Sequence, residues 1–600
     1  MTKQVRELEP FPNLVTMFFA RAREKGEAPF LWRKQEEAWQ SISWAEAARI
    51  VAAMATALKD LGFRSGDRIA LISENRPEWC LADLAIMAAG CVTVPTYTTN
   101  TERDHLHILE NSGARGAFVS SAKLAGNLLP AIYQSSSCRT VIGFERLRVG
   151  QQSDVTVHDW STLIEKHPAD PERIAAEADF AREDLACIIY TSGTGGAPRG
   201  VMQHHGAILH NVAGCCTVIA EDFGWEDEVF LSFLPPSHAY EHTGGQFLPI
   251  GLGGQIYYAE SLEKLAANIE EVRPTIMVVV PRLFEVLRQR IVKAIEKQGK
   301  LPSYLLNRAL AIGRERAAGG LPLRDMPMDL ILDRTLRPQV QKRFGGRMKA
   351  MVSGGAPLNS DVGLFFQSLG LTLLQGYGQT EAAPVISCNR PSAGIKMDTV
   401  GPPLKNTRVR IAEDGEILVQ GELVMHGYWQ NEEETARVLK DGWLHTGDIG
   451  HLDEKGRLVI TDRKKDIIVN DKGDNVAPQR IEGMITLQPE ILQAMIYGDQ
   501  RPYLVGLIVP DPEWVKQWCA ANGLACDPAA LRKNPALIRA LMDAVDRVNT
   551  GLSVTERVRR VIVADAPFTV ENEQLTPSMK IRRHVLKQVY GPRLDALYRP

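Results

Sequence analysis

A chain of 600 residues is too long for one hydrophobic core, because single cores stop growing near roughly 250 to 300 residues, so two or more domains are expected. With 44% hydrophobic and 24% charged residues, the composition is that of a folded globular protein rather than a disordered one. The net charge of -3 leaves no broad basic field for phosphates, so nucleic acid is not expected as a main partner.

Cysteine usage and apolar stretches indicate where the protein resides. Nine cysteines without a C-x-x-C pair predict neither a disulfide framework nor a zinc ligand set, which favours a reducing compartment. Residues 1–12 lack the apolar core of a signal peptide, and the most apolar stretch, residues 81–95, is interrupted by Asp83 and too short to span a bilayer. We therefore expect a cytoplasmic protein, at most peripheral to the membrane, that acts as a monomer or homodimer.

The N-terminal two thirds alternate between strand and helix patterns. Residues 68–72 and 276–280 have the apolar runs of buried strands, and residues 79–89 carry apolar residues at helical spacing. One face of a further amphipathic helix follows Pro281, with Leu283, Leu287, Ile291 and Ile295. This alternation predicts an α/β fold of layered subdomains with largely parallel strands.

The pattern of predicted secondary structure changes after residues 401–403. Short strand patterns at residues 409–411 and 417–419 flank a turn at residues 413–415, which predicts a small β-rich subdomain. A charged run at residues 462–466 then precedes a last mixed α/β segment. We predict an N-terminal domain at residues 1–461, a hinge at 462–466 and a smaller, mobile α/β C-terminal domain at 467–600.

A loop rich in glycine and hydroxyl groups follows the apolar strand pattern at residues 185–189. Its sequence is Tyr-Thr-Ser-Gly-Thr-Gly-Gly-Ala-Pro-Arg-Gly, residues 190–200. Glycines allow close backbone approach, and the hydroxyls and guanidinium add donors, a combination that suits polyphosphate. The Walker pattern fails because Val201 stands where lysine is needed, and the dinucleotide pattern fails because Pro198 replaces its third glycine. A flexible surface loop remains the alternative on composition alone.

The order of residues in this loop resembles the signature Thr-Ser-Gly-Thr-Thr-Gly-x-Pro-Lys-Gly of the acyl-adenylate-forming superfamily, which includes acyl-CoA synthetases, luciferases and peptide-synthetase adenylation domains. Gly195 replaces the second threonine of the pair, and Arg199 replaces the usual lysine while keeping its positive charge. The resemblance implies that ATP phosphates contact Thr191, Ser192, Gly193, Thr194, Gly195 and Arg199.

Two further segments, residues 353–357 and 375–381, resemble the motifs of that superfamily that bind adenine and the metal. By this resemblance Tyr377 stacks on adenine, Thr380 reaches the α-phosphate, and Glu381 holds Mg²⁺ together with Thr191. Carboxylate and hydroxyl oxygens suit a hard cation that bridges phosphates. The same motifs imply nucleotide contacts for Gly355, Ala356, Gln375, Gly376 and Gly378.

The remaining motifs follow along the chain in the same order as in the superfamily. Asp448 stands at the ribose-binding carboxylate with Arg463 beside it, and Lys465 stands at the hinge residue that absorbs the backbone change between half-reactions. Lys580, in residues 575–583, corresponds to the catalytic lysine, and His238 occupies the histidine position of the loop over the carboxylate. Taken singly, each has an ordinary alternative, such as a turn cap, a solvated ion pair or a surface lysine.

The resemblance therefore implies an enzyme that uses ATP, Mg²⁺ and CoA to convert a carboxylic acid first to acyl-AMP and then to acyl-CoA. Residues 280–285 and 475–482 most resemble bacterial long-chain fatty acyl-CoA synthetases, which makes a fatty acid the expected substrate. An adenylating enzyme for another acid or for an acyl carrier protein is the alternative. A catalytically degenerate regulator that binds acyl nucleotides is the more remote one, supported only by Gly195 and Arg199. Tyr240 and His242 are the nearest candidates for an aromatic gate of the acyl site.

Overall fold

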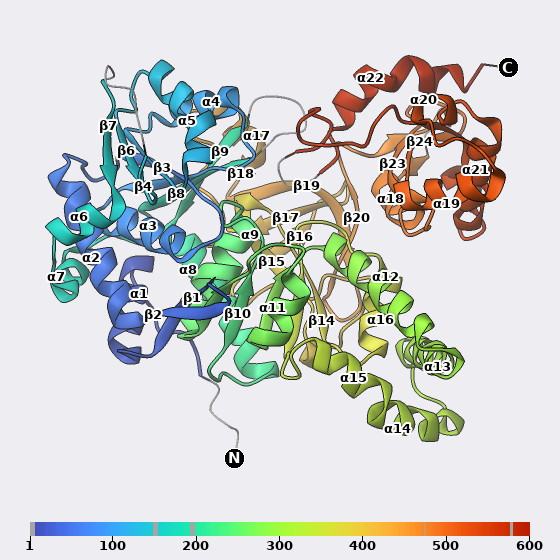
Figure 1. Ribbon diagram of the computed structural model, residues 1–600, viewed down its shortest axis with the longest axis horizontal. Helices are drawn as coiled ribbons and strands as arrows, with labels where there is room; N and C mark the ends of the chain where they lie inside the picture. The colour runs from blue at the N-terminus through green and yellow to red at the C-terminus, as the bar shows by residue number, and fades with distance from the viewer. Residues whose placement is uncertain (1–5, 148–153, 192–197, 473, 577–579, 600) are drawn as a thin grey trace.

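The computed structural model describes residues 6–147, 154–191, 198–472, 474–576 and 580–599. Its N-terminal part contains two large sheets with helices packed against them, and its C-terminal residues form a separate lobe at the upper right of Figure 1. The described residues include no helix that is both long enough and apolar enough to cross a bilayer.

The first sheet has seven strands in the order β7-β6-β5-β3-β4-β8-β9. Neighbouring strands are parallel except β8 and β9, which form an antiparallel pair. The strands are β3 (Arg68–Ile72), β4 (Val92–Pro95), β5 (Gly116–Val119), β6 (Thr140–Gly143), β7 (Thr156–Asp159), β8 (Leu185–Thr191) and β9 (Arg199–His204). The helices of this part are α1 (Leu14–Lys25), α2 (Trp44–Asp60), α3 (Pro77–Ala88), α4 (Glu102–Ser112), α5 (Ala122–Gln134), α6 (Trp160–Lys166), α7 (Pro171–Glu177) and α8 (His205–Asp222).

The second sheet has eight strands in the order β15-β14-β13-β12-β10-β11-β1-β2, and only its two outermost pairs are antiparallel. The strands are β1 (Pro29–Gln35), β2 (Ala38–Ser43), β10 (Val229–Ser232), β11 (Gln255–Tyr258), β12 (Ile276–Val279), β13 (Ala350–Ser353), β14 (Leu373–Gly378) and β15 (Val385–Cys388). The helical segments are α9 (Ala239–Glu241), the π-helix η1 (His242–Phe247), α10 (Leu248–Leu252), α11 (Leu265–Val272), α12 (Pro281–Lys297), α13 (Lys300–Ala317), η2 (Leu323–Asp325), α14 (Met326–Arg334), α15 (Leu336–Arg343), α16 (Ser360–Ser368), η3 (Thr380–Ala382) and η4 (Pro391–Ala393).

A smaller antiparallel sheet and the C-terminal lobe complete the chain. The small sheet contains β16 (Arg408–Ile411), β17 (Glu416–Gln420), β18 (Leu439–Lys440), β19 (Trp443–Leu452) and β20 (Leu458–Arg463), with α17 (Glu432–Val438) beside it. The lobe has two sheets, formed by β21 (Ile468–Val469), β22 (Asn475–Val476), β23 (Ile491–Tyr497), β24 (Leu504–Pro510) and β25 (Val558–Val563). Its helices are α18 (Pro478–Ile485), α19 (Pro512–Asn522), α20 (Pro528–Leu531), α21 (Pro535–Asn549), η5 (Val554–Glu556) and α22 (Arg583–Ala596).

The predicted α/β class is confirmed, and several elements coincide with their sequence patterns. The strand expected at residues 68–72 is β3, and the helix expected at residues 79–89 is α3. Helix α12 begins at Pro281, which suits the first turn because that position needs no backbone N–H. Its predicted apolar face packs on a core that contains Phe284 and Ile295, so the helical spacing identified the buried side.

Candidate active site

The predicted phosphate loop connects β8 to β9 and therefore closes a β-hairpin. Thr191, the last residue of β8, pairs directly with Arg199, the first residue of β9. The antiparallel ladder therefore holds the two residues that flank the loop side by side. The predicted contacts Ser192, Gly193, Thr194 and Gly195 lie outside the described residues.

Arg199 is held by two contacts from a distant part of the chain. Its Nη1 lies 2.5 Å from the Glu434 carboxylate, and its guanidinium carbon lies 4.7 Å from the centre of the Tyr428 ring. The Tyr428 hydroxyl in turn donates to Glu381 Oε1 at 2.8 Å. The arginine of the phosphate loop is thus connected, through one tyrosine, to the carboxylate predicted to hold the metal.

The surroundings of Glu381 fit a cation that takes most of its ligands from phosphate. Backbone contacts fix the segment, because Gln203 Nε2 donates to the Thr380 carbonyl at 2.7 Å and the Met425 N–H donates to the Glu381 carbonyl at 2.9 Å. Within the described part of the chain, no group of three or more His, Cys, Asp and Glu side chains is arranged to hold a metal. The Glu381 carboxylate and the Thr191 hydroxyl are hard oxygen donors, which Mg²⁺ prefers, and Mg²⁺ bound to nucleotide commonly keeps few protein ligands.

Asp448 and Arg463 lie opposite each other on neighbouring strands β19 and β20, where their positions pair in register. Arg463 Nε donates to Asp448 Oδ1 at 3.1 Å, and the Tyr377 hydroxyl donates to Asp448 Oδ2 at 2.6 Å. Burial and the adjacent carboxylate raise the Tyr377 pKa well above its usual value, so the phenol remains a donor. The three residues predicted at adenine and ribose therefore form one hydrogen-bonded group.

The glycine positions predicted to line the nucleotide lie where strands of the second sheet end. Gly355 follows β13 with φ +81°, a left-handed conformation that glycine adopts without steric cost, and Ala356 comes next. Gly378 ends β14 in close contact with the next segment, since a Cβ there would lie 1.8 Å from the Pro384 carbonyl oxygen. Gly376 lies within β14 and pairs with Cys388 of β15.

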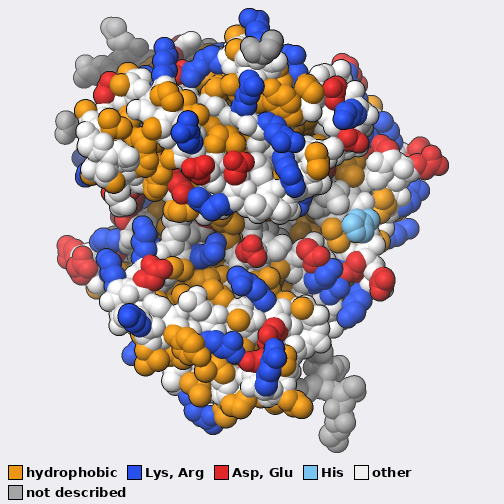
Figure 2. Space-filling model, turned by 90° about the vertical axis from the view of Figure 1, so that its right-hand side faces the viewer, with side chains coloured by type: hydrophobic (Ala, Val, Ile, Leu, Met, Phe, Trp, Pro, Cys, Tyr) orange, Lys and Arg blue, Asp and Glu red, His pale blue; other side chains and the backbone are white. Residues whose placement is uncertain are grey.

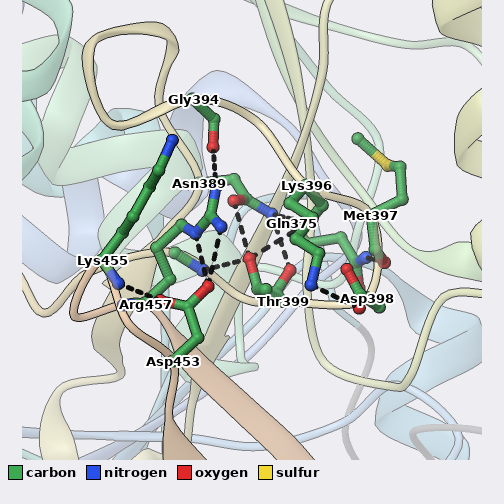
Figure 3. Close-up of polar contacts among 11 residues, drawn as sticks. Gln375, Asn389, Gly394, Lys396, Met397, Asp398, Thr399, Asp453, Lys455 and Arg457 are labelled. Atoms are coloured by element: carbon green, nitrogen blue, oxygen red, sulfur yellow. Dashed lines mark hydrogen bonds and ion pairs between the residues drawn. The ribbon is translucent and has the colours of Figure 1, made fainter. Parts of the chain in front are cut away.

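Gln375 belongs to a polar network that fixes the segment after β15 (Figure 3). Its side-chain amide donates to the Met397 carbonyl, and the backbone carbonyl of Gln375 accepts from the Asn389 N–H at 2.8 Å. Asn389 Nδ2 also donates to the Thr399 carbonyl at 2.6 Å. The Gln375 side chain is thus engaged within the protein, and its contact with nucleotide stays a prediction.

Arg457 connects that segment to the turn between β19 and β20. It forms an ion pair with Asp453 at 2.7 Å, and its Nη1 donates to the Gly394 carbonyl at 2.8 Å (Figure 3). The segment that follows β15 is therefore held to the same small sheet that contains Asp448.

Lys580 belongs to the C-terminal lobe but lies close to charged groups of the N-terminal part. Two hydrogen bonds join it to Thr576: the Lys580 N–H donates to Thr576 Oγ1 at 3.0 Å, and the Lys580 carbonyl accepts from the Thr576 N–H at 2.8 Å. The Lys580 side chain retains contact with solvent, yet the protein around it lowers its pKa by desolvation and by the charge of Arg463, against the opposite effects of Asp448 and Glu381.

The charge of the Lys580 ammonium also acts on His238. Burial lowers the His238 pKa to about 4, and the positive charge of Lys580 contributes to this. Its Nδ1 accepts the Tyr240 N–H at 3.2 Å and so caps α9. His238 is therefore neutral at physiological pH. Lys580 therefore interacts electrostatically with the residues predicted to bind the acyl carboxylate, the ribose and the metal.

Lys465 lies in the turn between β20 and β21, between two residues anchored to different parts of the molecule. Lys464 pairs with Asp414 at 2.6 Å in the small sheet. Asp466 accepts from Gln479 Nε2 at 2.8 Å, on α18 of the C-terminal lobe. This position suits a hinge, and the domain limits 1–461, 462–466 and 467–600 stay predictions.

A buried polar cluster beside His238 was not expected from the sequence. Asp83 and His242 are fully buried and lie 2.9 Å apart, and Gln246 Nε2 donates to the same carboxylate oxygen at 2.7 Å. Glu241 accepts from Ser232 Oγ at 2.6 Å, and burial raises the Glu241 pKa to about 8.

The two gate candidates are both held by hydrogen bonds in this structure. The Tyr240 hydroxyl donates to the Val352 carbonyl at 2.8 Å, and His242 is bound to Asp83. Movement of either ring would break a buried hydrogen bond, so neither swings freely.

Two residues that complete the site, Tyr428 and Glu434, were also missed in the sequence. Glu434 lies in the acidic run at residues 432–434, which is typical of a solvated helix start. The aromatic pair Tyr428 and Trp429 after Gly427 was the available signal, since adjacent aromatics in a β-rich region frequently pack against a second element.

Residues 18–429 match the family model described as AMP-binding enzyme, and residues 465–600 match the one described as AMP-binding enzyme C-terminal domain. The chain is 31% identical over 594 residues to "Long-chain-fatty-acid--CoA ligase FadD15" of Mycobacterium tuberculosis, which covers 98% of this chain and 97% of that protein. It is 28% identical over 605 residues to "Long-chain-fatty-acid--CoA ligase 5" of Mus musculus, covering 94% and 85%.

Among solved structures, the adenylation domain of a carboxylate reductase from Mycobacterium chelonae superposes with a TM-score of 0.75 at 23% identity, covering 98% of this chain and 92% of that one. The A domain of the carboxylic acid reductase from Segniliparus rugosus, in complex with AMP and a co-purified carboxylic acid, gives a TM-score of 0.74 at 22% identity, covering 98% and 94%. At these identities the similarity establishes a shared fold.

Proposed function

Because this chain belongs to the AMP-binding enzyme family and is an adenylate-forming ligase, we propose that it converts a long-chain fatty acid, ATP and CoA to acyl-CoA, AMP and pyrophosphate. Relatives with 31% identity over nearly their whole length carry the name of this activity, which supports the acyl chain and the acceptor. The observation that carries the proposal is the hydrogen-bonded group of Tyr377, Asp448 and Arg463, since the charges of Arg463 and Asp448 also act on the pKa of Lys580 from the C-terminal lobe.

In the first half-reaction, a carboxylate oxygen of the fatty acid attacks the α-phosphorus of ATP, a new O–P bond forms, and pyrophosphate leaves. By this proposal the Lys580 ammonium contacts both the acyl carboxylate and the α-phosphate, so it orients the two anions and offsets the charge that develops between them. Asp448 accepts from the ribose hydroxyls, and neutral His238 positions the carboxylate without adding charge. Glu381 and Thr191 would hold Mg²⁺, which would neutralise charge on the phosphates when bound.

In the second half-reaction, the CoA sulfur attacks the acyl carbonyl of acyl-AMP. A C–S bond forms, the bond between the acyl carbon and the phosphate oxygen breaks, AMP leaves, and the thiol proton passes to solvent. Lys580 is not required for this step, so rotation about Lys465 that withdraws it leaves room for the thiol.

The test is carboxylate-dependent ATP/pyrophosphate exchange over acids of graded chain length. The highest kcat/KM is expected for a long-chain acid, and thioester formation with CoA is expected to exceed that with an acyl carrier protein. Exchange that is best with an aryl or short acid contradicts the substrate, and preference for the carrier protein contradicts the acceptor.

Lys580→Ala separates the two half-reactions. Loss of one oriented charge costs on the order of 10² to 10³ in rate, so exchange is expected to fall by that factor, while thioester formation from supplied acyl-AMP falls much less. Lys587→Ala, on the exposed side of α22, is the matched control and is expected to leave both steps unchanged. Equal loss of both steps in Lys580→Ala removes the assignment.

A further inference from the structure

Helix α14 and the turn before it present apolar side chains to solvent. Leu323 is 84% exposed, and Met326, Leu330 and Ile331 are 52%, 52% and 47% exposed. Their spacing of three, four and one residues places all four on one face of the helix. This segment is therefore amphipathic, with its apolar face directed outward.

The opposite face of α14 carries carboxylates, which the protein satisfies. Asp325 pairs with Arg308 at 2.5 Å, and Asp329 pairs with Arg316 at 2.6 Å and with Arg337 at 2.8 Å. The inward side of α14 also buries Leu332 in the core, with Met328 packed against it. The orientation of α14 is thus fixed by Leu332 and by these ion pairs, and the apolar residues of its outward side are additional to those that it buries.

Exposed hydrophobic residues concentrate in this part of the chain. Twelve large hydrophobic side chains are exposed among the described residues, and six of them lie within residues 301–331. Helices α13 and α14 project from the lower right of the molecule in Figure 1. Figure 2 views the molecule from that side, and its lower part shows hydrophobic side chains interspersed with Lys and Arg. Contiguous exposed apolar surface of this kind marks a binding site.

The same segment is strongly basic, although the whole chain has a net charge of -3. Residues 281–343 contain fourteen Lys and Arg against six Asp and Glu, a net charge of +8. Three of those acids are the α14 carboxylates already paired with arginine. Arg334 is exposed next to the apolar face, and so is Arg324, although Arg324 also pairs with Asp325 at 3.2 Å. The surface therefore combines apolar side chains with an excess of positive charge.

We propose that the outward face of α14 docks onto a membrane surface that contains anionic phospholipid. Apolar side chains of an interfacial helix enter the boundary between headgroups and acyl chains, while arginines pair with lipid phosphates. Charge decides between this occupant and a second copy of the chain, because two segments of +8 repel each other when they face, whereas an anionic bilayer attracts them.

Helix α12 connects the docking face to the active site. It starts at Pro281, directly after Val280, whose Cγ1 lies 4.0 Å from the position of a Cβ on Gly355, and its 17 residues span about 25 Å before α13 begins. The benefit of docking rests on the proposed function, because a long-chain fatty acid partitions into lipid. The evidence for the docking surface does not depend on that function. A docked enzyme takes its substrate from the bilayer to which it is bound.

The test is flotation of the full chain with vesicles, without ATP or fatty acid. Wild type is expected to float with vesicles of phosphatidylglycerol and phosphatidylcholine in equal parts, and weakly with phosphatidylcholine alone. Replacement of Leu323, Leu330 and Ile331 by serine is expected to lower partitioning at least about tenfold. The matched control makes the same change at three exposed positions elsewhere, Leu262, Leu452 and Val554.

Charge is tested separately. Arg324→Gln and Arg334→Gln are each expected to lower partitioning onto anionic vesicles roughly fivefold, and high salt is expected to reduce binding of wild type. Absence of wild-type flotation, or equal flotation of the triple serine variant, overturns the proposal. If sedimentation velocity shows a dimer for wild type and a monomer for the triple serine variant, the face is an interface between two copies of the chain instead.

Failure of docking and failure of the proposed function remain distinguishable. Exchange with a long-chain acid dispersed in detergent reports the function alone, and the triple serine variant is expected to retain it. Loss of that exchange in wild type contradicts the substrate assignment whatever the flotation result.

Discussion

Replacing Glu241 with glutamine is expected to stabilise the folded protein, and increasingly so as pH rises. The side chain is 2% exposed, its Oε1 accepts from Ser232 Oγ at 2.6 Å, and its Oε2 has no hydrogen-bond partner in the described structure. Burial raises the Glu241 pKa from 4.5 to about 8. Glutamine keeps an acceptor for Ser232 and removes the ionisation, so it isolates the cost of the charge.

The sign and size follow from linkage. A carboxylate whose folded pKa is raised favours folding below its unfolded pKa of 4.5, and stability is lost as pH rises through the folded value of about 8. Each pH unit in that window costs about 1.4 kcal/mol, so wild type loses about 3 kcal/mol at pH 7 and up to about 5 kcal/mol above pH 8. Glu241→Gln avoids this loss and gains little at pH 5.

Thermal unfolding measured from pH 5 to 8.5 tests the expectation. Unfolding entropy of about 2.1 cal/mol/K per residue gives about 1 kcal/mol/K for a cooperative unit of roughly 460 residues, so the Tm of Glu241→Gln should exceed that of wild type by about 3 °C at pH 7 and differ little at pH 5.

Glu78→Gln is the matched control, because hydrogen bonds and charges from Arg76 and Arg33 outweigh burial and lower the Glu78 pKa. That variant is expected to be less stable than wild type at neutral pH. A Tm difference for Glu241→Gln that is constant with pH, or a lower Tm than wild type at pH 8, refutes the reasoning.

Four other variants address the active site through ATP/pyrophosphate exchange, AMP binding and the dependence of rate on pH. Arg199→Lys is expected to stay active, whereas Arg199→Ala is expected to raise the KM for ATP on the order of tenfold by loss of a charged donor; an unchanged KM would mean that the side chain points away from the phosphates. Asp448→Asn is expected to weaken AMP binding on the order of tenfold or more by calorimetry, and equal affinity excludes a role at the ribose. Since the His238 pKa of about 4 keeps the ring neutral, the rate profiles of His238→Ala and wild type should be parallel between pH 5 and 8, and a wild-type ionisation near 6.5 that the variant lacks contradicts this.

Elements whose identity depends on local spacing were predictable from the sequence. Strand β3 is buried on both faces and has a continuous apolar run, and α12 repeats apolar residues every turn, so each pattern determined one structure. The hairpin of β8 and β9 was not predicted, because antiparallel pairing of Thr191 with Arg199 depends on the loop between them and on neighbouring strands.

Those residues of the candidate site that belong to a recognisable sequence motif were predictable. Tyr377, Asp448 and Arg463 were each expected at the nucleotide, and the structure brings them into one hydrogen-bonded group. The contact between Arg199 and Glu434 joins residues 235 apart in sequence, and an acidic run has no local sign of a distant partner. The inward carboxylates of α14 were hidden for the same reason.

The substitution of Arg199 for the usual lysine has a structural reason within this chain. A guanidinium is planar and can stack on an aromatic ring while it pairs with a carboxylate, whereas an ammonium acts as a single point charge. Arg199 uses both properties, toward Tyr428 and Glu434. Because the Tyr428 hydroxyl also holds Glu381, the arginine fixes the tyrosine that orients the carboxylate. Arg199 and the predicted metal ligand Glu381 are therefore joined by one connected set of contacts, and a change at Arg199 is expected to affect the orientation of Glu381 as well.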